Sequence, residues 1–292
     1  MRLAPLALTV AVACGGDDTV PTLDAALPFT CDATSALHAR FVVVGEPASS
    51  GPIGSQVGGA YHDHPAPRTE ATMAEAGGCR YVAARPALCE PACTGSDVCD
   101  VDGHCGGYPT TLAAGTLTVT GTTPPITLEP QPGNSYYPQT SYPGLYRPGD
   151  ELTFALAGAG PVPPLTATVR GVPSLALPTD QLTAIEHQPL RIAWTPITTP
   201  AGAEVLVHLD NDHHGLAAYL ECTAPASAGE LTVPAAILDP LILAGESGIG
   251  TYIENAWIEV RHRALVTTPY GCAAVDGYAD QFLFVDTVRA PT

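Results

Sequence analysis

The sequence predicts an all-β protein, with an immunoglobulin-like antiparallel β-sandwich over residues 107–292 and a small, disulfide-stapled N-terminal region before it. Three observations lead to this fold class. Short runs alternate between apolar and polar residues, glycine and proline turn signals separate these runs, and one short segment holds four cysteines. Seven or more short strands at such spacing are typical of a sandwich.

The alternation is clearest from Thr116 onward. In Leu190–Trp194, three large apolar residues lie on one face of the expected strand, and Arg191 and Ala193 lie on the other. The runs expected to form strands in this part are 116–120, 152–156, 190–194, 204–210, 216–222, 257–263 and 282–285. The segment 234–239 begins with proline, which suits the first turn of a helix, and predicts a short helical crossover.

Residues 29–88 are expected to form a small β region of their own. Strands are predicted at 39–44, 56–62 and 79–83, and a brief helix between Arg68 and Ala76. A disulfide between Cys31 and Cys79 is expected to tie the ends of this region. Cys222 and Cys272 are then the natural pair within the sandwich.

Residues 89–106 are predicted to be a Cys-rich disulfide knot. Four cysteines in so short a segment replace a hydrophobic core, and each bridge contributes about 2–4 kcal/mol. Four cysteines allow three pairings, and we favour Cys89–Cys99 with Cys93–Cys105. Zinc is the alternative, but only the gap between Cys89 and Cys93 has the usual knuckle spacing.

The first residues resemble an export signal. The apolar stretch 3–13 is shorter than the ~20 residues that span a bilayer, and Ala13 places a small residue before Cys14. We therefore expect residues 1–13 to be a lipoprotein signal peptide, Cys14 to be lipidated, and 14–28 to be a flexible tether. The alternative is an ordinary secretory peptide with an incidental cysteine.

This signal predicts a location in the bacterial cell envelope. The chain would be anchored by lipid to the outer or inner membrane and face the periplasm or the cell exterior. Of nine cysteines, eight remain besides Cys14, an even number that fits a disulfide-bonded exported protein. The cysteines expected in disulfides are Cys31, Cys79, Cys89, Cys93, Cys99, Cys105, Cys222 and Cys272.

The composition restricts the partners. The formal net charge is −18, and all eleven basic residues are arginine. Nucleic acid and anionic lipid surfaces are argued against, because both are bound through basic patches. The membrane, through the lipid anchor, and an unknown protein or glycan are the partners that we expect.

Several of these features occur together in one known group of proteins. The first of these features is Cys14-Gly15-Gly16-Asp17, which is followed by Cys31, by Gly78-Cys79-Arg80 and by the spacing Cys-x3-Cys-x5-Cys-x5-Cys. A long β region that contains residues 190–194 and Cys222 comes after these motifs. This order resembles uncharacterised cysteine-containing lipoproteins of myxobacteria and related bacteria. The resemblance implies an envelope location and a β-rich fold, and it implies no active site.

Two clusters are candidates for ligand binding. Tyr136, Tyr137, Tyr142 and Tyr146 lie in one proline-rich loop, where tyrosines offer apolar faces and hydroxyls to sugars or proteins. The alternative is a loop that folds its tyrosines over the sandwich. His208, Asp210, Asp212, His213 and His214 combine imidazole and carboxylate groups that suit a transition metal. Their composition is also that of a turn.

The sequence gives no recognisable catalytic motif. Gly245-Glu-Ser-Gly-Ile249 lacks the second glycine of a nucleophile elbow. A phosphate-binding Gly-x4-Gly-Lys motif is excluded by the absence of lysine, and His-Glu-x-x-His is also absent. We therefore expect a non-enzymatic interaction or structural role and predict no cofactor. A carbohydrate-binding module or a metal-binding hydrolase is the alternative.

Overall fold

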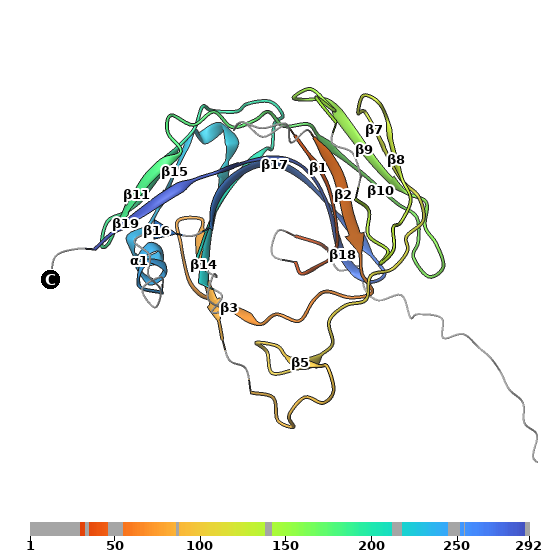
Figure 1. Cartoon of the computed structure of the whole chain (residues 1–292), viewed down its shortest axis with the longest axis horizontal. Coiled ribbons are helices and arrows are strands. Elements are labelled where there is room, and N and C mark those ends of the chain that lie inside the picture. Colours follow the sequence, from red (N-terminus) through yellow and green to blue (C-terminus); the bar gives the residue numbers. More distant parts are fainter. Residues whose placement is uncertain are drawn as a thin grey trace, which may run out of the picture. The chain divides into compact units, whose positions relative to one another are not determined.

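The computed structural model describes residues 30–32, 35–45, 55–85, 88–137, 142–211, 218–244, 252–253 and 255–289. Residues 31–292 form one compact unit. The predicted all-β class is confirmed, because the described part of the chain consists mainly of strands (Figure 1). None of the described helices has the length and apolarity needed to cross a bilayer.

Within the described residues, the largest sheet has eight strands in the order β2-β1-β18-β17-β13-β14-β4-β3. Its strands are β1 (Leu37–Val44), β2 (Gln56–Tyr61), β3 (Glu70–Ala76), β4 (Cys79–Ala84), β13 (Glu204–Asp210), β14 (Ala218–Pro225), β17 (Asn255–Thr268) and β18 (Gly271–Phe282). Neighbouring strands are antiparallel except β1 and β18, which run parallel. The chain therefore joins its first and last thirds in one sheet.

Two further layers cover one face of this sheet (Figure 1). The first core lies under β11 (Gln181–Ile185), β12 (Leu190–Ala193), β15 (Glu230–Val233), β16 (Tyr252–Ile253), β19 (Phe284–Val288), η2 (Ala226–Ala228) and α1 (Ala235–Ala244). The second core lies under a four-stranded sheet of β7 (Leu117–Thr120), β8 (Ile126–Leu128), β9 (Glu151–Leu156) and β10 (Leu165–Arg170). The four-stranded sheet and the eight-stranded sheet pack face to face, as in the predicted sandwich.

Each core is filled mainly by apolar side chains that occupy alternate positions along the strands. Trp194, Leu209, Leu220, Leu238 and Ile258 are buried in the first core. The second core buries Phe41, Tyr61, Leu117, Phe154 and Val275. Because successive side chains of a strand point to opposite faces, the positions between these residues point away from the cores.

The β17–β18 hairpin runs across both cores. Ala256, Ile258 and Val260 of β17 lie in the first core, and Ala264 and Val266 pack against the second. The two strands pair continuously from Trp257↔Phe282 to Thr268↔Gly271. One hairpin thus connects the two halves of the molecule.

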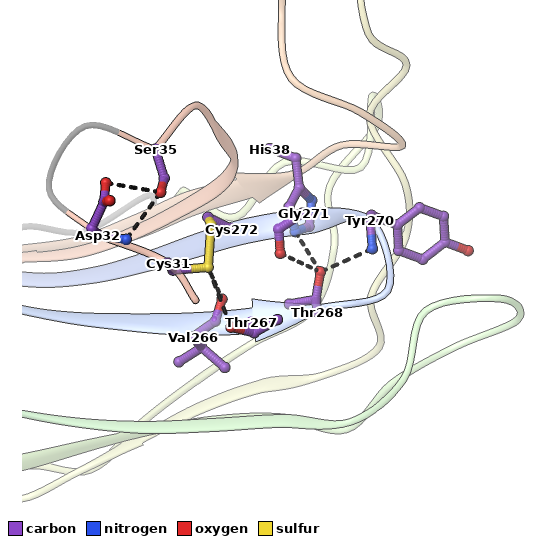
Figure 2. The surroundings of a disulfide bond; sticks show 10 residues. All are labelled: Cys31, Asp32, Ser35, His38, Val266, Thr267, Thr268, Tyr270, Gly271 and Cys272. Carbon is purple, nitrogen blue, oxygen red and sulfur yellow. Dashed lines mark hydrogen bonds between the residues drawn. A yellow bond between two sulfur atoms is a disulfide. The ribbon is translucent and has the colours of Figure 1, made fainter. Parts of the chain in front are cut away.

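Thr268 closes the turn of this hairpin (Figure 2). Its hydroxyl donates to the Gly271 carbonyl oxygen at 3.1 Å and accepts a bond from the Tyr270 N–H at 3.2 Å. The Nε2 atom of the buried His38 lies 2.7 Å from the hydroxyl oxygen of Thr268. These contacts fix the turn of the hairpin against β1.

The disulfides join distant parts of the chain. Cys31 pairs with Cys272, and Cys79 pairs with Cys222 across the neighbouring strands β4 and β14. In Figure 2 the first of these bridges lies beside the β17–β18 turn, with the Cys31 sulfur 3.4 Å from the Thr267 hydroxyl oxygen. The expected pairs Cys31–Cys79 and Cys222–Cys272 are therefore wrong, because the N-terminal strands pair with the C-terminal ones.

The Cys-rich segment forms as predicted. Cys89 pairs with Cys99, and Cys93 pairs with Cys105, around the short strands β5 (Val98–Cys99) and β6 (Cys105–Gly106). Hydrogen bonds from the backbone N–H groups of Asp102 and His104 to one Asp100 carboxylate oxygen, both at 2.9 Å, hold the turn between these strands. All four sulfurs are in disulfides, so they are not arranged as a zinc site.

Two other predictions for the N-terminal part are corrected. Residues 29–88 do not form a region of their own, because β1 to β4 all belong to the sheet that also contains β17 and β18. The stretch expected to form a brief helix is the strand β3, which pairs with β4. The helix expected at 234–239 is present as α1 and continues to Ala244.

Disulfide mapping of the unreduced protein tests this topology. After proteolysis we expect one peptide pair linked through Cys31 and Cys272 and another through Cys79 and Cys222, together with the two bridges of the Cys-rich segment. The measurement is mass spectrometry before and after reduction. Recovery of a Cys31–Cys79 peptide would contradict the sheet order, since that pairing requires a separate N-terminal region.

Candidate functional site

The face of the eight-stranded sheet that points away from both cores carries charged and aromatic side chains. In β17 these are Trp257, Glu259, Arg261 and Arg263, which alternate with the core residues of the same strand. The neighbouring strands contribute polar positions in the same way. We call this face of the sheet the inner face.

A cavity of about 910 Å³ lies on the inner face, and we call it the groove. It is lined by Arg40, residues 75–80, Glu204, Leu206, His208, Glu221, Thr223, Trp257, Glu259, Arg261, Arg263, Tyr278 and Asp280. Four of the chain's eleven arginines therefore lie in one place, although the chain as a whole is acidic. The same lining holds five acidic residues, so charges of both signs meet in the groove.

Asp276 binds two of the arginines that line the groove. Its carboxylate is fully buried and accepts bonds from Arg263 Nε at 2.6 Å and Nη2 at 2.7 Å, and from Arg40 Nε at 2.8 Å. Burial favours the neutral acid, but the two guanidinium groups outweigh it and lower the pKa of Asp276. One carboxylate thus fixes two arginines from two strands and holds them at the edge of the groove.

Glu221 anchors the opposite side. Arg80 donates to its carboxylate from Nη2 at 2.6 Å and from Nε at 3.1 Å, and His208 Nδ1 lies 3.3 Å away. Burial opposes ionisation, but His208 and Arg80 outweigh it and lower the pKa of Glu221 to about 2. Glu221 is therefore ionised throughout the physiological pH range.

His208 lies between two aromatic rings. Trp257 stacks on one side with ring centroids 3.8 Å apart, and Tyr219 on the other at 5.0 Å. Burial opposes protonation of the imidazole, but the carboxylates of Asp210 and Glu221 outweigh it and raise the pKa of His208. The stack fixes the indole ring of Trp257 at the groove.

Glu259 and Asp280 lie directly opposite each other on β17 and β18. Burial raises the pKa of Glu259 although several arginines surround it, and burial also raises the pKa of Asp280. Arg261 reaches Glu259 with Nη1 at 3.3 Å and Glu204 with Nη2 at 3.6 Å. Carboxyl groups and guanidinium groups thus alternate across the floor of the groove.

Two smaller cavities adjoin the groove. One, of about 400 Å³, shares Arg40 and Tyr278 with it and is also lined by His62 and Tyr137. The other, of about 680 Å³, shares Arg80 and Arg263 and is also lined by residues 66–72, which include the first residues of β3. The inner face therefore offers an extended surface rather than one isolated pocket.

The four tyrosines of the predicted ligand-binding loop do not form one face. Tyr136 is fully buried, and its hydroxyl donates to the Gly115 carbonyl oxygen at 2.6 Å. Tyr142 and Tyr146 pack against the second core. Tyr137 is 57% exposed and is the member of the set that lines a described cavity. Tyr136, Tyr142 and Tyr146 therefore follow the alternative interpretation, in which the loop folds its tyrosines over the sandwich.

The predicted histidine and aspartate cluster is placed only in part. His208 lines the groove, and an Asp210 carboxylate oxygen lies 3.6 Å from its Nε2 atom, whereas Asp212, His213 and His214 are outside the described residues. Among the described residues, the group of three possible metal ligands is Cys89, Cys93 and Cys99, and each of these sulfurs is in a disulfide. The described part of this cluster does not form a metal site. Cys14 also lies outside the described residues.

Several groove residues were not identified from the sequence. The predicted strand 257–263 contains Trp257, Glu259, Arg261 and Arg263. These four residues occupy alternate positions, so the sequence indicates that they share one face of the strand. The same alternation places Tyr278 and Asp280 on the inner face. Nothing in the sequence alone shows that these strands are neighbours.

Comparison with known proteins gives little further information. No protein-family model matches the chain, and no curated protein matches it. Among solved structures, the chain is similar to the FN1–FN3 domains of chicken CNTN1, with 11% identity over 78% of this chain and 67% of that chain and a TM-score of 0.18. A likeness at this level carries no argument about fold or function.

The role of Asp276 can be tested by its replacement with asparagine. We expect Asp276→Asn to lower the free energy of unfolding by about 3 kcal/mol, because the change leaves Arg263 without its anionic partner in a buried site. Chemical denaturation at neutral pH measures this loss. Glu230→Gln is the control, since it breaks an exposed ion pair with Arg191 and is expected to cost at most about 1 kcal/mol. Equal losses would contradict the role assigned to Asp276.

The contact between His208 and Glu221 predicts a pH-dependent effect. Because the folded protein raises the pKa of His208, stabilisation by its protonation is present below the unfolded pKa of about 6.5 and is lost as the pH rises through the folded value. Glu221→Gln removes part of this stabilisation. We therefore expect the variant to lose more stability at about pH 5.5 than at about pH 8.5, and the NMR titration midpoint of His208 to fall.

Glu230→Gln is the matched control for this prediction. It removes a carboxylate that pairs with Arg191 on the surface, where no histidine takes part in the ion pair. The loss of stability in this control is expected to be equal at both pH values. An unchanged titration midpoint of His208 in Glu221→Gln would contradict the assigned contact.

Proposed function

We propose that this chain is a lipid-anchored cell-envelope protein with a non-enzymatic role, and that it binds a partner molecule in the groove. The observation that carries the binding role is the groove itself. It is a large cavity lined by residues from seven neighbouring strands, and its charged residues are held in place by buried ion pairs. Ligand sites are typically preformed and concave in this way.

The envelope location is supported by the disulfides. Four bridges join the eight cysteines other than Cys14, and one of them links residues 241 positions apart. Such bridges persist in oxidising compartments outside the cytoplasm. They agree with the signal-like segment 1–13, which would direct export, and with Cys14 directly after it, which would carry the lipid.

The arginine-paired carboxylates fit a binding role. Glu221 in the groove and Asp276 beside it have lowered pKa values and are engaged by arginines, so they serve as fixed anions. The described lining of the groove contains one cysteine, Cys79, and its sulfur is in a disulfide with Cys222. The described lining thus lacks a free thiol nucleophile.

Replacement of Cys14 tests the anchor. We expect the full-length protein to be found in the membrane fraction and to incorporate labelled palmitate, and we expect Cys14→Ser to lose the label and to appear in the soluble fraction. Tyr108→Phe, a conservative change at an exposed residue, is the control and is expected to behave like the unmodified chain. Membrane retention of Cys14→Ser would count against lipid anchoring.

A further inference from the structure

We propose that the groove binds a neutral saccharide chain. This inference rests on the proposed function, because it names the class of ligand for the surface already assigned to binding. It goes beyond the tyrosine loop considered in the sequence, since the residues that carry it come from the inner face of the eight-stranded sheet. Four properties of the groove support it.

The first property is the mixture of charges. Arg261 lies beside Glu204 and Glu259, and Arg80 lies beside Glu221. An anionic ligand placed here meets carboxylates, and a cationic ligand meets guanidinium groups. A hydroxyl both donates and accepts hydrogen bonds, so neighbouring hydroxyls of a sugar match an acid and an arginine at the same time.

The second property is hydrogen-bonding capacity inside the groove. The side chains of Arg80 and Glu204 line the groove and are each 47% exposed, although each takes part in an ion pair. A guanidinium group and a carboxylate each have more hydrogen-bonding positions than one ion pair uses. Ligand hydroxyls can bond to the remaining positions.

The third property is the set of aromatic side chains. Trp257 lines the groove, its ring fixed by the stack with His208. Tyr278 lines both the groove and the adjoining cavity, Arg40 lies 5.7 Å from the centroid of its ring, and Tyr137 also lines that cavity. Aromatic rings present an apolar face together with a polar group, which suits the C–H faces and hydroxyls of sugar rings.

The fourth property is the extent of the surface. The groove shares Arg40 and Tyr278 with one cavity and Arg80 and Arg263 with another. A ligand that fills this surface is elongated, so a chain of several sugar units fits it better than a single sugar.

A peptide is the competing occupant, and the groove suits it poorly. Strand addition requires an unpaired edge, but among the described strands that line the groove only β3 is an edge strand, and the others are paired on both sides. A helical peptide requires a hydrophobic groove for its apolar face. The aliphatic side chains in the described lining are only Ala76 and Leu206.

The test uses the full-length chain purified in detergent and an array of neutral, acidic and amino oligosaccharides. We expect binding to neutral oligosaccharides, with an affinity that changes little with salt because no net charge is neutralised. Trp257→Ala is expected to weaken this binding about tenfold or more, as truncation of an aromatic anchor does. Tyr252→Ala is the control, since Tyr252 is exposed on β16 and does not line the groove.

A second variant keeps the test decisive, because Trp257 also packs against His208. Glu259→Gln preserves the shape of the side chain and is likewise expected to weaken binding. An array without neutral ligands, or binding that survives both variants, would overturn the proposal. Capture of peptides from a defined library that is lost in Trp257→Ala would also overturn the saccharide assignment, while leaving the groove as the binding surface.

Discussion

The pairing of β17 with β18 is the constraint on which the rest of the structure depends. Both strands are long enough to pass from the first core to the second, and together they form the middle of the eight-stranded sheet. β1 joins one side of this hairpin and β13 joins the other. Residues from the beginning, middle and end of the chain can therefore share one sheet only because this hairpin is continuous.

The same hairpin explains why the groove and the cores occur together. One set of alternate residues in β17 is mostly apolar and contributes to the two cores, so the other set lies on the inner face. Charges on that face are tolerated because they neutralise one another, as Asp276 does for Arg263 and Arg40. The groove is thus a consequence of the strand pattern, and its ion pairs keep the exposed side of the sheet in a defined arrangement.

Local features were predictable from the sequence, whereas long-range partners were not. The strand Glu204–Asp210 has the predicted bounds, and the Cys-rich bridges close loops of only 10 and 12 residues. β18 was missed because a small-residue strand that is buried on both faces gives no alternation. β3 consists of good helix formers, but pairing with β4 decides its conformation. Groove residues from separate strands meet only through the sheet order.

The bridge between Cys31 and Cys272 also determines how a mechanical load would enter the fold. Tension applied to the chain before residue 31 reaches a covalent bond at Cys31 before it reaches the hydrogen bonds of β1. That bond transfers the load to the start of β18, in the middle of the sheet, where strands pair on both sides. A pull from the N-terminal side is therefore resisted by shearing a central strand, and β1 is protected from being peeled away one residue at a time.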